Sequence, residues 1–269
     1  MIRVPQSRRL LLRLRHGGLR WLWYALRDRV APVHPRFLPL AREAFLHRTG
    51  LEIGGPSRLF GPGGGLPVYA WADTLDNVNF ATETAWEHAL SDDGPFLFHP
   101  AKPPGRQCLR EATILRGLAD SSFDFVVSSH CLEHVANPLG ALAEWARVTK
   151  PGGYLLLVLP DPPRTFDHRR PVTSLDHLRA DRAAGTPESD TTHFAEVLAL
   201  HDLRLDPGAG TRAEFADRVA ANARTRCIHH HVFDEALVSA ALREAGWDPL
   251  AVERFAPIHL GALARKAAP

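Results

Sequence analysis

Apolar side chains between residues 123 and 161 follow two different periods. Residues 123–128 (FDFVVS) form a short apolar, β-branched run that reaches a Ser-Ser pair, which is typical of a buried strand meeting a loop. A helix is then predicted to begin at Asn137-Pro138. Its apolar residues recur at helical spacing: Leu139, Leu142, Trp145 and Val148. Residues 154–159 (YLLLVL) are a second, wholly apolar strand candidate. The sequence therefore predicts strand, helix and strand in succession.

This succession within so short a stretch is a βαβ crossover. Such a unit implies a parallel sheet that is covered on both faces. Residues 150–153 (KPGG) are predicted to end the crossover helix, because proline cannot continue it and glycine suits a left-handed cap.

The remaining elements are shorter. Upstream, we expect a helix at residues 40–47, a first strand ending at residues 51–53, a second strand at 67–71 and a weakly marked third near 107–112. Downstream, we expect an amphipathic helix at 233–245, with Asp234 near its start, and closing strands at 250–255 and 259–264. The prediction is an α/β fold: a doubly wound, Rossmann-like, mostly parallel sheet of seven strands.

Two further segments flank or interrupt this sheet. Residues 1–40 are predicted to be a basic, helical N-terminal extension, and residues 41–269 one domain. Within that domain, the polar residues 162–232, rich in Asp, Arg and His, form a helical and loop insertion after the fifth strand. We expect this insertion to fold over the open strand ends as a lid for the molecule that accepts the transferred group.

Charge is distributed unevenly along the chain. The net charge is +2 in total, but residues 1–50 hold eleven Arg and two acids, so the remainder is acidic. Alternating Arg with Leu and Trp in the extension suits packing on the domain, and a weak contact with a membrane surface is the second interpretation. No apolar run is long enough to span a bilayer, and three scattered cysteines indicate a reducing, cytoplasmic setting. The Arg-, Ala- and Pro-rich composition is typical of a bacterial gene.

Candidate ligand-binding residues follow the predicted strands. In open α/β sheets, ligands bind beyond the carboxyl ends of the strands. Glu52 and the turn Gly54-Gly55-Pro56 come at the end of the first strand, and the turn lacks the spacing of a dinucleotide fingerprint. Asp73 and Asp76 are expected near the end of the second strand, where an acid can accept hydrogen bonds from both ribose hydroxyls. Asp76 is preferred for this role, with Asn77 beside it as a further cofactor-binding candidate. Ala112, Ser129 and His130 complete the set at later strand ends.

Histidine supplies the candidate catalytic groups. A neutral imidazole is a suitable general base near pH 7. His168, His193 and His230 are predicted to serve, with His168 preferred because Asp167 beside it could orient its ring.

Residues 130–134 (HCLEH) also match an inverted zinc-protease pattern, in which a helix would place His130 and His134 on one face. Its position directly after a buried strand argues against that use, and we expect no metal. A metal shared by the histidine clusters stays open as an alternative.

Several segments together resemble class I S-adenosylmethionine-dependent methyltransferases, in particular one bacterial subgroup. They span about residues 50–265 and read LEIGGPS, DNVNFATETAWE, SSHCLEHVANP, TFDHRRPVTSLDHL and RCIHHHVFD. The resemblance implies S-adenosyl-L-methionine as cofactor, with the Gly54-Gly55 turn against its amino acid end. Two departures are visible: Ser57-Arg58 stand where a third glycine is usual, and only residues 111–113 (EAT) offer a third-strand acid.

The predicted function is therefore methyl transfer to oxygen or nitrogen of a small-molecule or glycan acceptor. Nucleic acid is not expected as a partner, because the core has neither a basic excess nor an aromatic stacking series. Two alternatives from other classes remain: a catalytically inactive protein that still binds S-adenosylmethionine, and a metal-dependent hydrolase that uses the histidine clusters.

Overall fold

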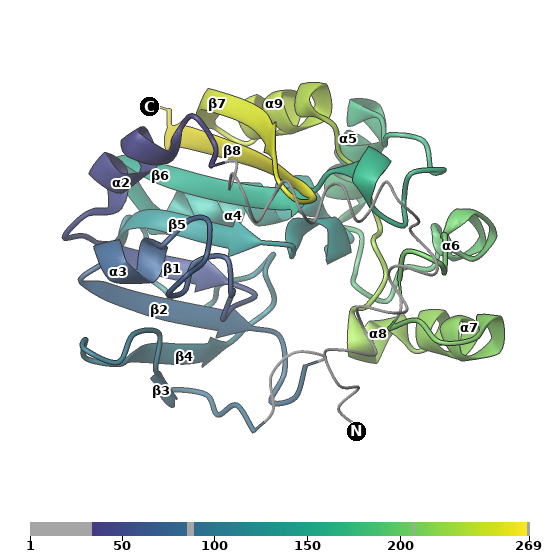
Figure 1. Ribbon diagram of the computed structural model, residues 1–269, viewed down its shortest axis with the longest axis horizontal. Coiled ribbons are helices and arrows are strands. Elements are labelled where there is room, and N and C mark those ends of the chain that lie inside the picture. The colour runs from purple at the N-terminus through teal and green to yellow at the C-terminus, as the bar shows by residue number, and fades with distance from the viewer. Residues whose placement is uncertain (1–33, 85–88, 207, 268–269) are drawn as a thin grey trace.

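The computed structural model describes residues 34–84, 89–206 and 208–267. An eight-stranded sheet runs through it in the order β3-β4-β2-β1-β5-β6-β8-β7 (Figure 1). The predicted α/β doubly wound fold is confirmed, with eight strands in place of seven. Residues 1–33 lie outside the described part, so most of the predicted N-terminal extension, and its membrane contact, does as well.

Five central strands are parallel: β1 (Thr49–Ile53), β2 (Thr74–Asn79), β4 (Gly105–Leu109), β5 (Phe123–Ser129) and β6 (Thr149–Pro160). Three others run antiparallel to a neighbour: β3 (Pro95–Phe96) pairs with β4, and β8 (His259–Lys266) lies between β6 and β7 (Trp247–Phe255). The strand order reverses between β1 and β5. That switch point is where a sheet of this kind leaves a crevice for a ligand.

Apolar residues bury both faces of the sheet. On one face α4 (Pro138–Val148), α5 (Leu175–Ala184) and α9 (Glu235–Glu244) pack around the buried Trp145 and Trp247. On the other face lie α2 (Leu38–Phe45) and α3 (Val68–Trp71), with the Phe45 ring 4.5 Å from that of Phe125. Helices on both faces explain why residues 125–128 of β5 and 155–160 of β6 are buried without a break.

Local caps confirm two predicted helices. The Asn137 side chain accepts a hydrogen bond from the Gly140 amide at 2.9 Å and begins α4, and Asp234 caps α9 through the Leu237 amide at 2.8 Å. The α4 helix ends at Val148, before the KPGG segment that was expected to end it. That segment continues into β6 instead, where Thr149 already pairs with Phe123 across an irregular register.

Residues 67–71, predicted to be the second strand, form α3 instead. A short apolar run cannot be assigned to strand or helix from its periodicity alone. Val68, Tyr69 and Trp71 are all buried under the sheet, and β2 begins three residues after the helix ends. Because the second strand lies further along the chain than predicted, different residues lie at its carboxyl end.

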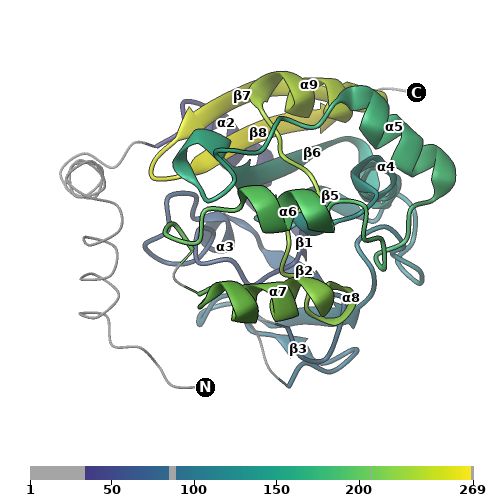
Figure 2. The same cartoon turned by 90° about the vertical axis from the view of Figure 1, so that its right-hand side faces the viewer.

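The insertion after β6 is helical, as predicted. It contains η2 (Pro162–Arg164), α5, α6 (Phe194–Leu200), α7 (Arg212–Ala220) and α8 (Asn222–Thr225). Helices α6, α7 and α8 stand beyond the carboxyl ends of the parallel strands (Figures 1 and 2). Val197, Phe215 and Val219 give these helices a small core of their own.

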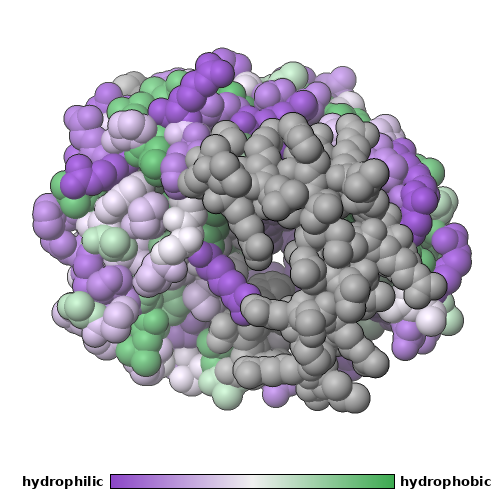
Figure 3. All heavy atoms as spheres, viewed as in Figure 1, coloured by the Kyte–Doolittle hydropathy of each residue, from purple (hydrophilic) through white to green (hydrophobic). Residues whose placement is uncertain are grey.

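Exposed apolar side chains are dispersed. On the face in Figure 3, apolar residues of the described part stand among polar ones. Among the residues that the structure describes, every helix is too short or too polar to traverse a lipid bilayer.

Candidate functional site

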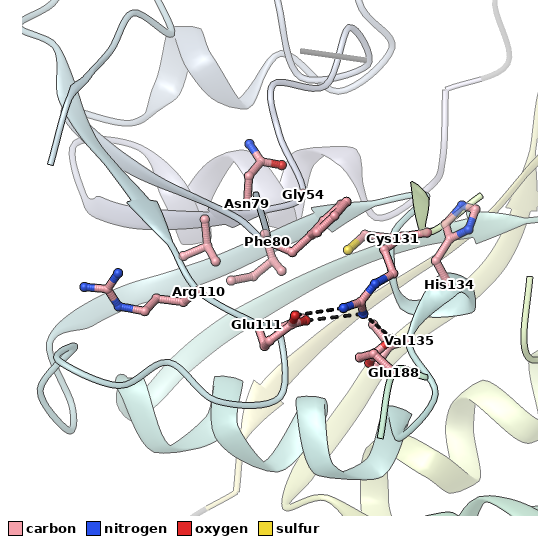
Figure 4. A pocket seen from close by; sticks show the side chains of 13 residues that line it. Gly54, Asn79, Phe80, Arg110, Glu111, Cys131, His134, Val135 and Glu188 are labelled. Carbon is pink, nitrogen blue, oxygen red and sulfur yellow. Dashed lines mark hydrogen bonds and ion pairs between the residues drawn. The ribbon is translucent and has the colours of Figure 1, made fainter. Parts of the chain in front are cut away.

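A cavity opens at the carboxyl ends of β1, β2, β4 and β5, next to the switch point of the sheet (Figure 4). Thirteen residues line it, eleven from the sheet's strand ends and the loops that follow them and two from the insertion: Ile53, Gly54, Val78, Asn79, Phe80, Arg110, Glu111, Ala112, Cys131, His134, Val135, Glu188 and Arg226. A second, shallower hollow shares Phe80, Arg110 and Glu111 with it and continues along Ile114 and Gly117. The two hollows adjoin along these three shared residues.

Glycine is required at the first strand end. Gly54 has a φ of +82°, and a Cβ built on it would lie 2.8 Å from Cys131 Sγ. Its amide donates to the Val78 carbonyl at 2.8 Å. A side chain here would both strain the backbone and collide with the cavity wall. The structure therefore leaves backbone open to a ligand at the point where the sequence predicts it.

Glu52 lies underneath this turn and is fully buried. One carboxylate oxygen accepts from the Ser57 amide at 2.9 Å, and the other accepts from the Tyr69 hydroxyl at 2.7 Å. Burial raises the pKa of Glu52 to about 8, although both hydrogen bonds act in the opposite direction. Glu52 thus supports the turn and is not among the described cavity residues; the exposed Pro56 is not among them either.

Two asparagines hold the Gly55 peptide. Asn77 accepts from the Gly55 amide at 3.1 Å and donates to its carbonyl at 3.2 Å, while Asn79 donates to the same carbonyl at 2.7 Å. Asn79 lines the cavity, and its Oδ1 is buried with no hydrogen-bond partner among the described residues. An unsatisfied acceptor on a cavity wall is a position for a ligand hydroxyl.

Asp76 does not lie at the end of the second strand, so that expectation is wrong. β2 runs to Asn79, and Asp76 sits in its middle, opposite Leu51. The Asp76 carboxylate accepts from the Arg106 amide at 2.8 Å and faces the Arg106 guanidinium at 3.6 Å. Asp73 precedes the strand and bonds His47 at 3.0 Å on the surface. Asn79 is the residue at the strand end. No signal in the sequence pointed to it, because the apolar run at 67–71 indicated a strand in the wrong place.

An ion-pair bridge crosses the outer wall. Arg226 from the insertion lies 2.8 Å from Glu111 and 2.6 Å from Glu188, with its guanidinium 5.1 Å from the centre of the Phe80 ring. Figure 4 shows Glu111 and Glu188 joined through this bridge (dashed lines). The predicted Ala112 lies beside it, and its carbonyl accepts from the Trp145 indole at 2.9 Å. The bridge closes the insertion against the sheet.

The end of β5 contributes residues other than those predicted. Ser129 ends the strand, and His130 follows with a φ of +52° and a bond from its Nε2 to His259 Nδ1 at 2.9 Å. Burial lowers the pKa of His130 to about 3, so the ring is neutral. Neither residue is among those described as lining the cavity. Cys131 and His134 line it instead.

Of the three predicted catalytic histidines, only His168 stands apart, since the rings of His193 and His230 lie 5.9 Å from each other, centre to centre. Among the described residues, none of the three lines the cavity. His168 is on the outer side of the insertion, where its Nε2 faces Asp202 at 3.1 Å. His193 Nε2 lies 3.1 Å from His177 Nε2, and the buried His230 ring contacts the Asn222 side chain at 3.2 Å. Asp167 does not orient His168 either.

Asp167 is instead the partner of His229. Its carboxylate bonds His229 Nδ1 and also lies 3.1 Å from the Arg170 guanidinium. These charges hold the pKa of the Asp167 carboxyl well below its usual range, against the effect of burial. The same neighbour raises the pKa of His229, although burial acts to lower it. The sequence signal for this pair was the run of three histidines at residues 229–231. Only the folded structure shows which of the three bonds Asp167.

Two clusters of metal-type ligands are present in the described part of the chain: His177 with His193 and His231, and Glu133 with His134 and His229. Ligand atoms within each cluster lie within 4.8 Å of one another. The H-x-x-E-H pattern is therefore not used as a helix with His130 and His134 on one face. Leu132–His134 is a single 3-10 turn, and His229 joins from the insertion.

The chain is similar to one known family and to several solved structures. The family model described as a methyltransferase domain matches residues 60–157. A SAM-dependent methyltransferase from Methanosarcina mazei is similar in structure at 20% identity, with 86% of this chain and 98% of that chain covered and a TM-score of 0.48. One from Mesorhizobium loti shares 15% identity, with 84% and 96% covered and a TM-score of 0.47. No curated protein sequence matches the chain.

Proposed function

We propose that this chain, whose residues 60–157 match a methyltransferase domain, is a class I, S-adenosylmethionine-dependent enzyme that methylates a small-molecule or glycan acceptor on oxygen or nitrogen. The cofactor is S-adenosylmethionine. The acceptor is the part of the function that rests on the site geometry rather than on the family match.

The observation that carries donor binding is the cavity at the switch point. Gly54 leaves backbone accessible at the end of β1, and the unpaired Asn79 Oδ1 suits a ribose hydroxyl at the end of β2. Phe80 and Ala112 offer apolar surface for an adenine ring, and the second hollow extends that surface. The order of these residues along the sheet matches the order of amino acid, ribose and base in the donor.

The insertion supports a small, polar acceptor. Helices α6 to α8 stand over the strand ends, and the side chains that reach the cavity from the insertion are Glu188 and Arg226. Charged groups of both signs suit hydroxyl-bearing or amine-bearing molecules better than a polyanion. The acidic balance beyond residue 50 likewise disfavours nucleic acid.

Methyl transfer asks little covalent chemistry of the protein. The acceptor oxygen or nitrogen forms a bond to the methyl carbon as the carbon–sulfur bond breaks, the acceptor proton leaves, and S-adenosylhomocysteine departs. The sulfonium is already activated, so in-line placement and exclusion of water provide most of the acceleration. Closure of the insertion through Arg226 suits both tasks.

Calorimetry with S-adenosylmethionine tests donor binding, and mass analysis after incubation with isotopically labelled donor and small-molecule extract tests transfer. A labelled product supports the proposal. Donor binding without any labelled product would favour the inactive binding protein. Absence of donor binding, together with metal-dependent ester or amide hydrolysis, would favour the hydrolase.

A further inference from the structure

We propose that Glu133, His134 and His229 bind one divalent transition-metal ion, of the zinc class, at the wall of the donor cavity. The three residues come from the turn after β5 and from the segment that follows α8, which fold together at this point. The site itself does not depend on the proposed function, while its role in activating an acceptor does.

Glu133 is the centre of the argument. Its side chain is 1% exposed, and neither carboxylate oxygen has a hydrogen-bond partner among the described residues. His134 Nε2 and His229 Nε2 each lie 3.9 Å from Glu133 Oε1. Two ligands held about 2.0–2.1 Å from a tetrahedral zinc ion are ~3.3 Å apart. The observed spacing is therefore within a small side-chain adjustment of coordination.

Hydrogen bonds on the far side of each ring orient the two histidines. His134 Nδ1 donates to the Ile228 carbonyl at 2.7 Å, and His229 Nδ1 donates to Asp167. When the outer nitrogen carries the proton, Nε2 of a neutral ring presents its lone pair to the interior. Metal-bound histidines are usually held in this way by a carboxylate or a backbone carbonyl.

The Asp167 carboxylate is fixed in turn by Arg170, whose side chain is also buried. Buried hydrogen bonds of this kind, from Arg170 to Asp167 to His229, are typical of a metal-binding histidine and not of a histidine on the surface. Two lone pairs and a carboxylate that face each other repel unless a metal ion or a proton lies between them. A proton is the competing explanation: on His229 it would pair with both Glu133 and Asp167, and on Glu133 it would bond an imidazole nitrogen.

The second histidine cluster is the weaker candidate. His177 Nε2 and His193 Nε2 contact each other at 3.1 Å, and His231 Nε2 lies 3.2 Å from the Ala136 carbonyl. These nitrogens already have hydrogen-bond partners, whereas the Nε2 atoms of His134 and His229 lie nearest to a carboxylate that has no partner in the described part of the chain. Asp181 Oδ2, 3.4 Å from His177 Nε2, is the oxygen of the second cluster that likewise has no partner there. The cluster is therefore useful as a matched control.

Two imidazoles and one carboxylate are the ligand set of many catalytic zinc sites, in which a further position stays open. His134 belongs both to this set and to the cavity lining. If the proposed function holds, the open position suits the oxygen of an acceptor hydroxyl. The ion would lower the pKa of that hydroxyl, its proton would pass to water, and the alkoxide would take the methyl group from sulfur.

The test uses the full chain, stripped of metal with a chelator and then titrated with Zn²⁺ against a chromophoric competitor. We expect one tight ion per chain in the wild type. Glu133→Gln and His229→Ala should each weaken zinc binding at least 100-fold, and Asp167→Asn by about 10- to 100-fold, as is usual for outer-shell partners. His193→Ala, in the other cluster, should bind zinc as the wild type does.

Two outcomes would overturn the site. Zinc binding that survives in Glu133→Gln and His229→Ala but is lost in His193→Ala would assign the ion to the other cluster. If the wild type does not bind zinc tightly, the three side chains are held together by a shared proton and not by a metal ion. Substitution with Co²⁺ gives an independent readout, since its visible spectrum reports coordination without any variant. Failure of the methyltransferase proposal would show in donor calorimetry, which is a separate measurement.

Discussion

The Asn79 side chain donates to the carbonyl oxygen of Gly55 at 2.7 Å, which ties the end of β2 to the turn after β1. This bond uses the nitrogen of the amide and leaves its oxygen as a buried acceptor on the cavity wall, with no partner in the part of the chain that the structure describes. One residue thus shapes the glycine turn and offers the acceptor that a ribose hydroxyl requires.

Asn79→Ala is expected to weaken S-adenosylmethionine binding by about tenfold, because it removes a hydrogen bond to the ligand and one to the turn. Asp76→Ala is the matched control, since Asp76 lies in the same strand and faces Arg106. Calorimetry on both variants decides the point. If Asp76→Ala binds the donor more weakly while Asn79→Ala binds it as the wild type does, Asp76 and not Asn79 contacts the ribose.

Gly54→Ala is expected to abolish measurable donor binding. Its Cβ would collide with Cys131, and the positive φ adds backbone strain. Gly246→Ala is the control for strain alone, since Gly246 has a φ of +85° and nothing within 4 Å of a built Cβ. That variant should lose roughly 1 kcal/mol of stability and keep its donor affinity. Equal donor affinity in the two variants would contradict the steric argument.

The contribution of Glu52 to the stability of the protein should fall as pH rises between about 4.5 and 8. The folded state keeps the Glu52 proton up to its raised pKa of about 8, whereas the unfolded chain releases it near the ordinary value of 4.5. The folded state therefore binds more protons in this window, and this contribution is complete below it and lost above it. Its slope is at most about 1.4 kcal/mol per pH unit.

Urea unfolding of the wild type and of Glu52→Gln, at several pH values across that window, measures this effect. The difference in unfolding free energy between the two proteins should change with pH in the direction given. A constant difference would mean that Glu52 is ionised in the folded state throughout.

Arg226→Ala is expected to destabilise the protein by about 1–3 kcal/mol, because Glu188 is then left buried without its cation. Burial already raises the pKa of Glu188, so removal of Arg226 should make its charge harder to keep. The double variant Arg226→Ala with Glu188→Gln should recover part of the loss. Thermal unfolding of the single and double variants checks this; a double variant less stable than Arg226→Ala would argue against the pairing.

His168→Ala is expected to leave turnover within about twofold of the wild type, as is usual for a substitution on the surface. The ring faces Asp202 on the outer side of the insertion, away from the described cavity residues. Steady-state rates with the identified acceptor measure it. A loss of 10²-fold or more, with the loss of an ascending pH limb, would restore His168 as the base.

The sequence by itself determined those parts of the protein in which the pattern is local and long. The apolar run of β5, the capped and periodic α4, and the closing strands β7 and β8 were all predicted near their observed bounds. Each is set by spacing that neighbouring residues carry. The glycine turn at Gly54 was also readable, since positive φ leaves few alternatives to glycine.

Tertiary structure alone decided the rest, because the deciding contacts join residues far apart in the chain. Residues 68–71 form a helix that buries Val68, Tyr69 and Trp71, with the Tyr69 hydroxyl bonded to Glu52. The second strand therefore ends at Asn79 and not at residue 71. Asp167 stands next to His168 in sequence yet bonds His229, 62 residues away. Glu133 meets His229 only when the insertion folds back over the strand ends. Spacing along the chain does not predict such pairs, because several side chains of the same type are available and only the packing of the folded chain decides which of them meet.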